Sequence, residues 1–412
     1  MIRVSSTLFA LLFFLMAFSG VAQARSLPPR ITTSKQLVNA QTQFALHLYK
    51  QLANKKGNLL FSPYSVSTAL TMTFAGARRA TAREMAKVLR LTGNPSLLTL
   101  AGRDMRELMK RAKQSGFQLS IANRLWGQKK YPFNNSFLNL LNTHYDAGLE
   151  LLDFKADPAA ARKVINAWVE KQTQKKIKDL IPRKVLKRDT RLVLTNAVYF
   201  KAKWASQFKK RNTHSADFWL TKSKRKKVKM MHQIRNFQYK AVKGLRILKV
   251  PYKGHQTSMV ILLPKKKEGW QEVQKRLNAT TWKQWTTGMK WKRVALGLPR
   301  FRFTAKARLK KALQKMGMKQ AFTNFADFSG MVKEKRRNTH RLKIDKVLHK
   351  AFIHVREGGT EAAAATAVIM IRATSAGIFR KPVRFVADRP FLFAIQDNKT
   401  GSLLFLGRVM KP

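Results

Sequence analysis

Cysteine is absent from all 412 residues of the chain. This absence excludes disulfide bonds, metal sites built from thiolates, and attachment of a lipid to an amino-terminal cysteine. A protein without disulfides must take its stability from a large apolar core. Apolar residues make up 45% of the sequence, which is ample for such a core.

Acidic residues are scarce. The chain has 20 Asp and Glu against 83 Lys and Arg, so its formal net charge is +63. The basic runs are spread along the sequence, at 175–188, 222–229, 264–267 and 334–343. A charge of this size predicts a polyanionic partner such as nucleic acid or a heparin-like glycan. A soluble, charged surface with no dedicated partner explains the composition equally well, so both interpretations stay open.

Long hydrophobic runs are missing, except at the amino terminus. Arg3, the apolar residues 8–18 and the small-x-small sequence Ala22-Gln23-Ala24 predict a cleavable signal peptide over residues 1–24. The protein is therefore expected to be secreted, or periplasmic in a bacterium, and not to span a membrane. No linker or internal repeat divides the remainder, which predicts one domain over residues 35–412.

Motifs of the common enzyme classes are also missing. The sequence has no Gly-x-Ser-x-Gly, no glycine-rich phosphate loop and no His-Glu-x-x-His, and its eight histidines lack metal-ligand spacing. The chain is therefore predicted not to be an enzyme, and to need no metal or cofactor.

Hydrophobic periodicity predicts helices early in the chain and strands late, an order typical of an α+β domain. The predicted helices are 33–53, one starting at Ser62-Pro63, 80–93, 98–113, 160–177 and 309–316. The predicted strands are 58–61, 119–126, 192–200, 258–263, 294–303, 385–395 and 402–409. The stretch EGGTEAAAATAVIM, 357–370, combines flexible glycines, helix-forming alanines and a strand-like end. Conflicts of this kind gather at functional or strained sites.

Five blocks of sequence identify a family. NLLFSPYSVSTALTMTFAGA (58–77), LVLTNAVYFKAKW (192–204), SMVILLPK (258–265), DKVLHKAFIHVREGGTEAAAATAV (345–368) and FVADRPFLFAIQDNKTGSLLFLGRV (385–409) occur in the order found in serpins. Together the blocks resemble a serpin over essentially the whole chain from about residue 35. The resemblance implies an α+β monomer with three β-sheets, eight or nine helices and an exposed reactive loop at about 357–381.

The resemblance also implies a mechanism. A serpin of this type inhibits serine proteases, or alternatively cysteine proteases, as a suicide substrate whose cleaved loop becomes a new central strand of the main sheet. The hinge of the loop would comprise Glu357, Gly358, Gly359, Thr360, Glu361, Ala362, Ala363, Ala364, Ala365 and Thr366. In a strand the side chains alternate, so the small residues 360, 362, 364 and 366 would face inward. A bulky or charged side chain there would be buried at a cost of several kcal/mol, on the order of 2–7.

Two alternatives remain for the loop. The alanine run could instead form an exposed helix, as in non-inhibitory serpins, and Gly358 stands where many relatives have a second acidic residue. Such a protein would be a cationic serpin-fold binder of polyanions such as nucleic acid or heparin-like glycan. For an inhibitor, family spacing places the reactive bond at Ala373–Thr374, which predicts an elastase-like target. The alternative bond, Arg372–Ala373, predicts a trypsin-like one.

Other family positions can be carried over individually. In serpins a hydrogen-bonded network controls the opening of the main sheet, and its positions correspond here to Ser62, Ser65, Asn196 and His349. Trp204 matches the tryptophan beneath the point where the loop first inserts. Heparin-activated serpins carry their glycan site on the helix that corresponds to 98–113. Its candidate contacts here are Arg103, Arg106, Lys110 and Lys113, although any helix of so basic a chain would show such a stripe.

Overall fold

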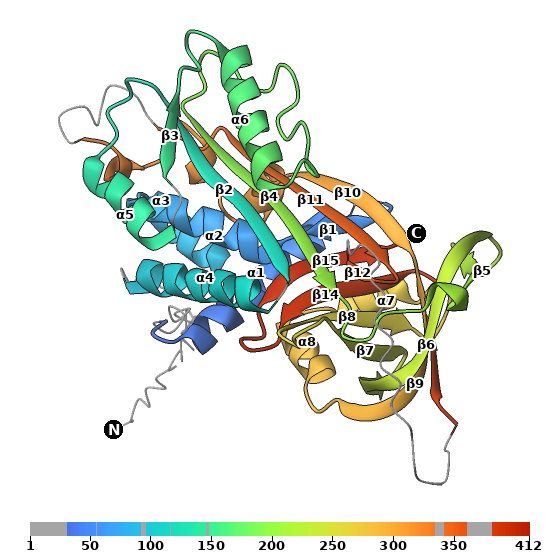
Figure 1. The fold of residues 1–412 in the computed structure, drawn as a ribbon. Helices are drawn as coiled ribbons and strands as arrows, with labels where there is room; N and C mark the ends of the chain where they lie inside the picture. Colours follow the sequence, from blue (N-terminus) through green and yellow to red (C-terminus); the bar gives the residue numbers. More distant parts are fainter. Residues whose placement is uncertain are drawn as a thin grey trace, which may run out of the picture.

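The computed structural model describes residues 31–54, 56–91, 96–115, 117–145, 148–333, 342–360 and 381–412. Within these ranges the chain forms nine α-helices and fifteen strands, so the α+β class is confirmed (Figure 1). The helices are α1 (Ser34–Leu52), α2 (Pro63–Phe74), α3 (Arg79–Leu89), α4 (Ser96–Gln114), α5 (Asn135–Tyr145), α6 (Pro158–Gln172), α7 (Trp270–Arg276), α8 (Ala279–Thr286) and α9 (Lys310–Lys315). None of them is both long and apolar enough to cross a membrane.

Local sequence explains where the helices around the main sheet begin. Ser62 caps α2, because its hydroxyl accepts a hydrogen bond from the backbone N–H of Ser65, and Pro63 occupies the first turn without losing a helical bond. Asp157 and Pro158 start α6 in the same way. At α1, Thr33 and Gln36 form a reciprocal capping box.

The six-stranded sheet is the main sheet of the fold. Its order is β10 (Phe301–Arg308), β11 (Lys346–Arg356), β12 (Gly359–Thr360), β4 (Leu192–Lys203), β2 (Gln118–Gln128) and β3 (Leu149–Leu152). The near-continuous apolar sequence of β4 predicts a central strand, and the structure places it there. Its Val193, Ala197 and Tyr199 pack with the core under α6, whereas Leu192 and Leu194 pack with α1 and α2.

The nine-stranded sheet completes the fold. Its order is β1 (Leu59–Phe61), β15 (Leu403–Val409), β14 (Phe391–Asp397), β8 (Thr257–Pro264), β7 (Leu245–Pro251), β6 (Arg225–Val242), β9 (Lys290–Pro299) and β13 (Val383–Val386), with β5 (Thr213–Trp219) paired to β6. Pairing of β7 is confined to the last five residues of the long strand β6, and β5 pairs with its first seven. In the described part of the chain the strands thus form two hydrogen-bonded sheets where three were expected, because the long strand β6 continues from the region of β5 and β9 into that of β7.

Two of the strands expected from sequence are each two strands. Residues 294–303 divide at Arg300, so that β9 belongs to the nine-stranded sheet and β10 to the six-stranded one. Residues 385–395 divide between β13 and β14, because Pro390 has no N–H for a sheet ladder. Hydrophobicity continues across both breaks, which is why the pattern alone suggested single strands.

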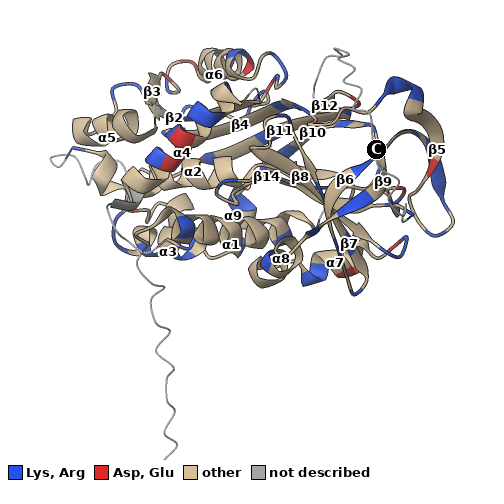
Figure 2. Ribbon diagram, turned by 60° about the horizontal axis from the view of Figure 1, so that its bottom comes forward, with Lys and Arg blue, Asp and Glu red and all other residues tan. Residues whose placement is uncertain are grey.

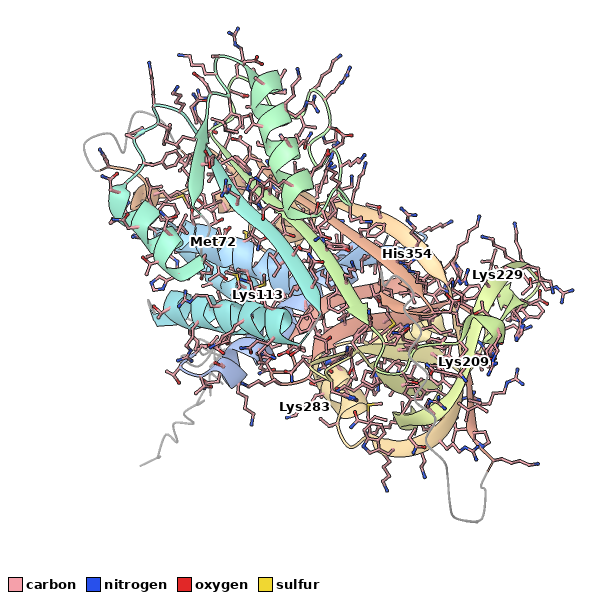
Figure 3. The ribbon with its side chains drawn as sticks, viewed as in Figure 1. Met72, Lys113, Lys209, Lys229, Lys283 and His354 are labelled. Carbon is pink, nitrogen blue, oxygen red and sulfur yellow. The ribbon has the colours of Figure 1, made fainter. Side chains whose placement is uncertain are left out.

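Lys and Arg residues recur over much of the ribbon in Figure 2, including α3, α4, β5 and β9, and Asp and Glu are few. In Figure 3, Lys113 lies on α4 and Lys283 on α8, whereas Lys209 and Lys229 lie near β5 and β6. The charge is therefore distributed, as the sequence predicts, and not gathered in a single arm.

Candidate functional site

A short strand occupies an opening in the centre of the main sheet. Over seven residues β11 and β4 pair directly in parallel, from Lys346 opposite Val193 to Phe352 opposite Tyr199. Beyond that point they separate, and β12 lies between them, antiparallel to both. Neighbouring strands lie about 4.8 Å apart, so β4 and β11 are about 10 Å apart where β12 is seated. The predicted hinge residues Gly359 and Thr360 therefore already form a strand of the sheet.

Gly359 is required by the way β12 enters the sheet. Its φ is +143°, a region that residues with a side chain rarely adopt. A Cβ at this position would lie 2.1 Å from the carbonyl oxygen of Ala202, 2.7 Å from Cα of Lys203 and 2.9 Å from the backbone nitrogen of Trp204. All three atoms belong to the backbone of β4 or the residue after it, so they cannot move aside as a flexible side chain could.

Thr360 is fully buried and contacts an aromatic pair. Its Oγ1 lies 2.8 Å from the hydroxyl of Tyr252, with which it shares a hydrogen bond. The ring of Tyr252 stacks on Trp204 with 4.5 Å between ring centroids, and burial raises the pKa of this tyrosine far above its usual value. Trp204 also donates hydrogen bonds from its indole to the carbonyl of Arg356 and from its backbone to that of Gly358, both at 3.0 Å. Trp204 thus lies against the turn that leads into β12.

Glu357 anchors the turn between β11 and β12. Its Oε1 accepts hydrogen bonds from Thr213 Oγ1 at 2.7 Å and from Nε of Arg300 at 2.8 Å, and Nη2 of Arg300 makes a further contact. Burial alone would raise the pKa of Glu357, but the bonds from Arg300 and Thr213 outweigh it and lower the pKa below the usual value. Arg300 is the residue between β9 and β10, so the hinge is tied to the point where the two sheets meet.

A buried polar network crosses the main sheet where β4 and β11 still pair directly. Asn123 of β2, Asn196 of β4 and His349 of β11 are in register, forming one row across three strands. The amide of Asn196 donates to Ser65 Oγ at 2.7 Å and to Asn123 Oδ1 at 2.6 Å, and Ser65 Oγ donates to that same Oδ1 at 2.8 Å. The four predicted residues, Ser62, Ser65, Asn196 and His349, are thus brought together. Asn123 was missed, and its only signal is a polar residue at an inward position of a strand.

His349 links β4 and β11 to the start of α2. Its Nδ1 is in contact with Asn196 Oδ1, and its Nε2 accepts a hydrogen bond from the backbone N–H of Ser62 at 3.1 Å. Because Nε2 accepts, the proton of the neutral ring is on Nδ1 and points to Asn196. Burial lowers the pKa of His349 to about 3. A strand that enters between β4 and β11 must break this contact, so the network holds the two strands together.

The predicted basic stripe on α4 consists of Arg103, Arg106, Lys110 and Lys113, and all four are exposed. Two of them have structural partners. Arg106 donates hydrogen bonds to the carbonyls of Thr143 and His144 at the end of α5, and Arg103 donates one to Ser34 Oγ at 3.5 Å. For these two residues the alternative interpretation, an ordinary structural arginine, has direct support.

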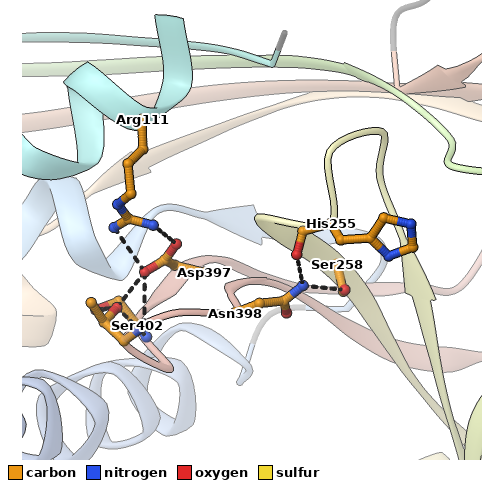
Figure 4. Close-up of polar contacts among 7 residues, drawn as sticks. Arg111, His255, Ser258, Asp397, Asn398 and Ser402 are labelled. Atoms are coloured by element: carbon orange, nitrogen blue, oxygen red, sulfur yellow. Dashed lines mark hydrogen bonds and ion pairs between the residues drawn. The ribbon is translucent and has the colours of Figure 1, made fainter. Parts of the chain in front are cut away.

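A buried ion pair fixes α4 to the core. Nη1 and Nη2 of Arg111 donate to the two carboxylate oxygens of Asp397 at 2.7 and 3.1 Å, and the side chains are 12% and 1% exposed (Figure 4). Asp397 ends β14 and also accepts from the backbone N–H of Thr400 at 3.0 Å. The stripe is thus held on a helix whose far side is bound to the β14–β15 turn.

Several predicted features lie outside the described residues. These are the signal peptide 1–24, the hinge residues Glu361 to Thr366, and the reactive bond at Ala373–Thr374 with its alternative Arg372–Ala373. They stay predictions from sequence.

Comparisons with known proteins agree on one family. The family model described as "Serpin (serine protease inhibitor)" matches residues 39–412. An uncharacterised serpin-like protein of Thermococcus kodakarensis is 40% identical over 378 residues, which cover 92% of this chain and 86% of the relative. The leukocyte elastase inhibitor of Homo sapiens is 38% identical over 389 residues, covering 92% and 100%.

Among solved structures, Serpin48 of the insect Tenebrio molitor superposes with a TM-score of 0.82 at 31% identity, covering 93% of this chain and 100% of that one. With the family model, these relatives and the architecture described above, the chain belongs to the serpin family.

Proposed function

We propose that this serpin inhibits serine proteases as a suicide substrate, by inserting its cleaved reactive loop into the main sheet. The observation that carries the proposal is β12, since its two residues pair with both β4 and β11. A sheet that holds the first residues of the loop between these strands has its site of insertion already open. The likeness to the leukocyte elastase inhibitor supports an elastase-like target.

The chemical step uses the protease's own machinery. Its serine hydroxyl attacks the carbonyl carbon of the reactive bond, for which we propose Ala373–Thr374, and the new amine of Thr374 departs to leave an acyl-enzyme. Insertion of the loop as a strand must then outpace hydrolysis of that ester. The free energy that drives insertion comes from the strand pairs that form when β12 lengthens between β4 and β11.

The test is incubation with an elastase-like and a trypsin-like serine protease, followed by a denaturing gel and sequencing of the new amino terminus. A complex that survives denaturation, with Thr374 as the new terminus, is the expected result. A terminus at Ala373 would move the reactive bond to its alternative. Cleavage without any complex would refute inhibition, although the fold would be unaffected.

A loop variant tests insertion itself. If the register of β12 continues, Ala364 will lie between Ala351 of β11 and Val198 of β4, which are both fully buried. Ala364→Arg would bury an unpaired guanidinium there, at a cost of several kcal/mol (on the order of 2–7), so we expect cleavage without trapping. Glu361→Gln is the matched control, since its neighbours in the same register, His354 and Lys201, are only half-buried. Trapping by Ala364→Arg at the wild-type level would rule out insertion.

A second proposal concerns the α4 stripe, which we infer to bind anionic glycans or nucleic acid. Lys110 and Lys113 are exposed and, among the described residues, make no ion pair, so their charges are available to a polyanion. This proposal does not depend on inhibition and would hold for a non-inhibitory serpin as well.

A further inference from the structure

A pocket of about 630 Å³ lies in the region of the nine-stranded sheet built from β5, β6, β9 and β13. These strands are neighbours in that order, and the chain after β13 returns to β5. There the backbone N–H of Trp219 donates to the carbonyl of Asp388 at 2.7 Å. The strands and this contact enclose a cup whose volume suits an organic molecule of moderate size.

The lining of the cup is mainly apolar. Its apolar residues are Ala216, Trp219, Met230, Ile234, Ala295, Leu296 and Val386. Ile234 is 46% exposed, and it is one of only five large hydrophobic side chains that are exposed in the described part of the chain. An exposed branched side chain at the wall of a pocket is a surface that an apolar ligand would cover.

The charges of the cup are uneven. Its two carboxylates are already neutralised, Asp217 by Arg225 and Lys227 at 3.0 Å each, and Asp388 by Arg389 at 2.7 Å. Arg384 also lines the cup, and its guanidinium has no hydrogen bond or ion pair to any residue that the structure describes.

A second guanidinium and two imidazoles lie near Arg384. Arg246 donates a hydrogen bond to the carbonyl of Arg384 at 3.2 Å, which brings a second guanidinium close. His232 lines the pocket too, and its ring lies 6.2 Å from that of His214. A Cβ at Gly297 would lie 3.2 Å from His232 and 3.0 Å from Val386, so these two side chains flank the same glycine. Burial and the nearby charges of His214 and Arg384 lower the pKa of His232, so this imidazole is neutral near pH 7. The unpaired positive charge of the cup is therefore that of Arg384, with the guanidinium of Arg246 nearby.

We propose that this cup is a binding site for a small organic anion, a carboxylate with an aromatic or branched aliphatic body. The body fills the space beside Ile234 and Val386, and the carboxylate pairs with Arg384. A guanidinium and a carboxylate form two parallel charge-assisted hydrogen bonds, which gives the site its selectivity for a planar anion. This proposal rests on none of the observations made for β12 or for the α4 stripe.

The probe for this site is 1-pyrenebutyrate, titrated into the full chain in 150 mM salt and followed by fluorescence anisotropy. The matched neutral compound is 1-pyrenebutanol, which keeps the body and removes the charge. We expect saturable binding of the carboxylate, at least tenfold tighter than that of the alcohol, since charge-assisted hydrogen bonds to a guanidinium are stronger than those of a neutral hydroxyl. Equal affinity for the two compounds, or no saturable binding, would overturn the proposal.

Two variants place the probe. Arg384→Gln removes the proposed anchor, and Ile234→Glu puts a carboxylate at the exposed wall, so each should weaken binding at least tenfold. Arg293→Gln is the control, because it removes one guanidinium from β9 outside the pocket lining and should change affinity by less than twofold. An equal loss in Arg293→Gln would reveal only general attraction to a basic protein. Competition by inorganic phosphate at the same concentration as the probe would likewise refute a site built for an apolar anion.

Discussion

The substitution Gly359→Ala, which adds a single methyl group, tests whether β12 lies between β4 and β11. Gly359→Ala would place a Cβ 2.1 Å from the carbonyl oxygen of Ala202, on a backbone whose φ is +143°. Overpacking of this kind costs about 1–3 kcal/mol, and the unfavourable backbone conformation about 1–3 kcal/mol more. The seated hinge should therefore lose about 2–6 kcal/mol.

The chain can avoid this cost by releasing β12 from the sheet. Release gives up the ladder to β4 and β11 and the hydrogen bond between Thr360 and Tyr252, at about 1 kcal/mol for each bond. We therefore expect Gly359→Ala to expose the hinge. Hydrogen exchange of the amides around Gly359 and Thr360 should accelerate at least tenfold. If inhibition occurs, insertion must slow in the same variant, so more protease escapes and more serpin is cleaved without a complex.

Gly57 supplies the control. Its φ is +90°, and no atom lies within 4 Å of where its Cβ would be. Gly57→Ala is thus disfavoured by its backbone conformation, but its methyl group clashes with no other atom. We expect this variant to leave the rate of hydrogen exchange at the hinge unchanged. Equal protection of the hinge in Gly359→Ala and wild type would refute the seating of β12 and the argument built on it.

Three further outcomes follow from the buried polar groups and the stripe. Burial lowers the pKa of His349 to about 3 from an unfolded value of 6.5. The stabilising effect of the neutral ring is therefore complete above pH 6.5 and is lost as the pH falls towards 3, by up to about 1.4 kcal/mol per pH unit. His349→Gln should flatten this part of the curve of unfolding free energy against pH, measured with denaturant, and an unchanged slope would contradict the argument. Asp397→Asn leaves Arg111 buried without its counter-charge, so the free energy of unfolding measured by urea denaturation should fall by about 3–5 kcal/mol. A change below about 1 kcal/mol would mean that water solvates the pair. Replacing Lys110 and Lys113 together by Gln should reduce the salt dependence of heparin binding, measured as the slope of log K against log salt, by about 1–2; an unchanged slope would place the glycan elsewhere.

The sequence could predict those parts of the fold that depend on local pattern. The near-continuous apolar run of β4 indicates a central strand, and Ser62-Pro63 marks the start of α2 by the chemistry of a helix amino terminus. The resemblance supplied the network residues, although their mutual contacts join positions up to 287 residues apart.

What could not be predicted depends on tertiary contacts. Nothing local to Tyr252 or Arg300 shows that they meet the hinge, because Tyr252 directly follows β7 and Arg300 lies between β9 and β10. Likewise, the ion pair of Arg111 and Asp397 spans 286 residues. The division of residues 294–303 into β9 and β10 is of the same kind, since both halves are strand-like and only their partners differ.

The hinge and the polar network belong to one line between β4 and β11. Thr360 pairs with Val355 and with Ala202, and a strand continued in the same register would bring Thr366 opposite both His349 and Asn196. That residue would arrive where Nδ1 of His349 contacts Asn196, so entry of the strand must separate the two. Unpaired polar groups in this buried row would be costly, and a threonine brings a hydroxyl that can donate and accept. The small polar residue at position 366, first noted as compatible with burial, thus has a specific reason to be polar.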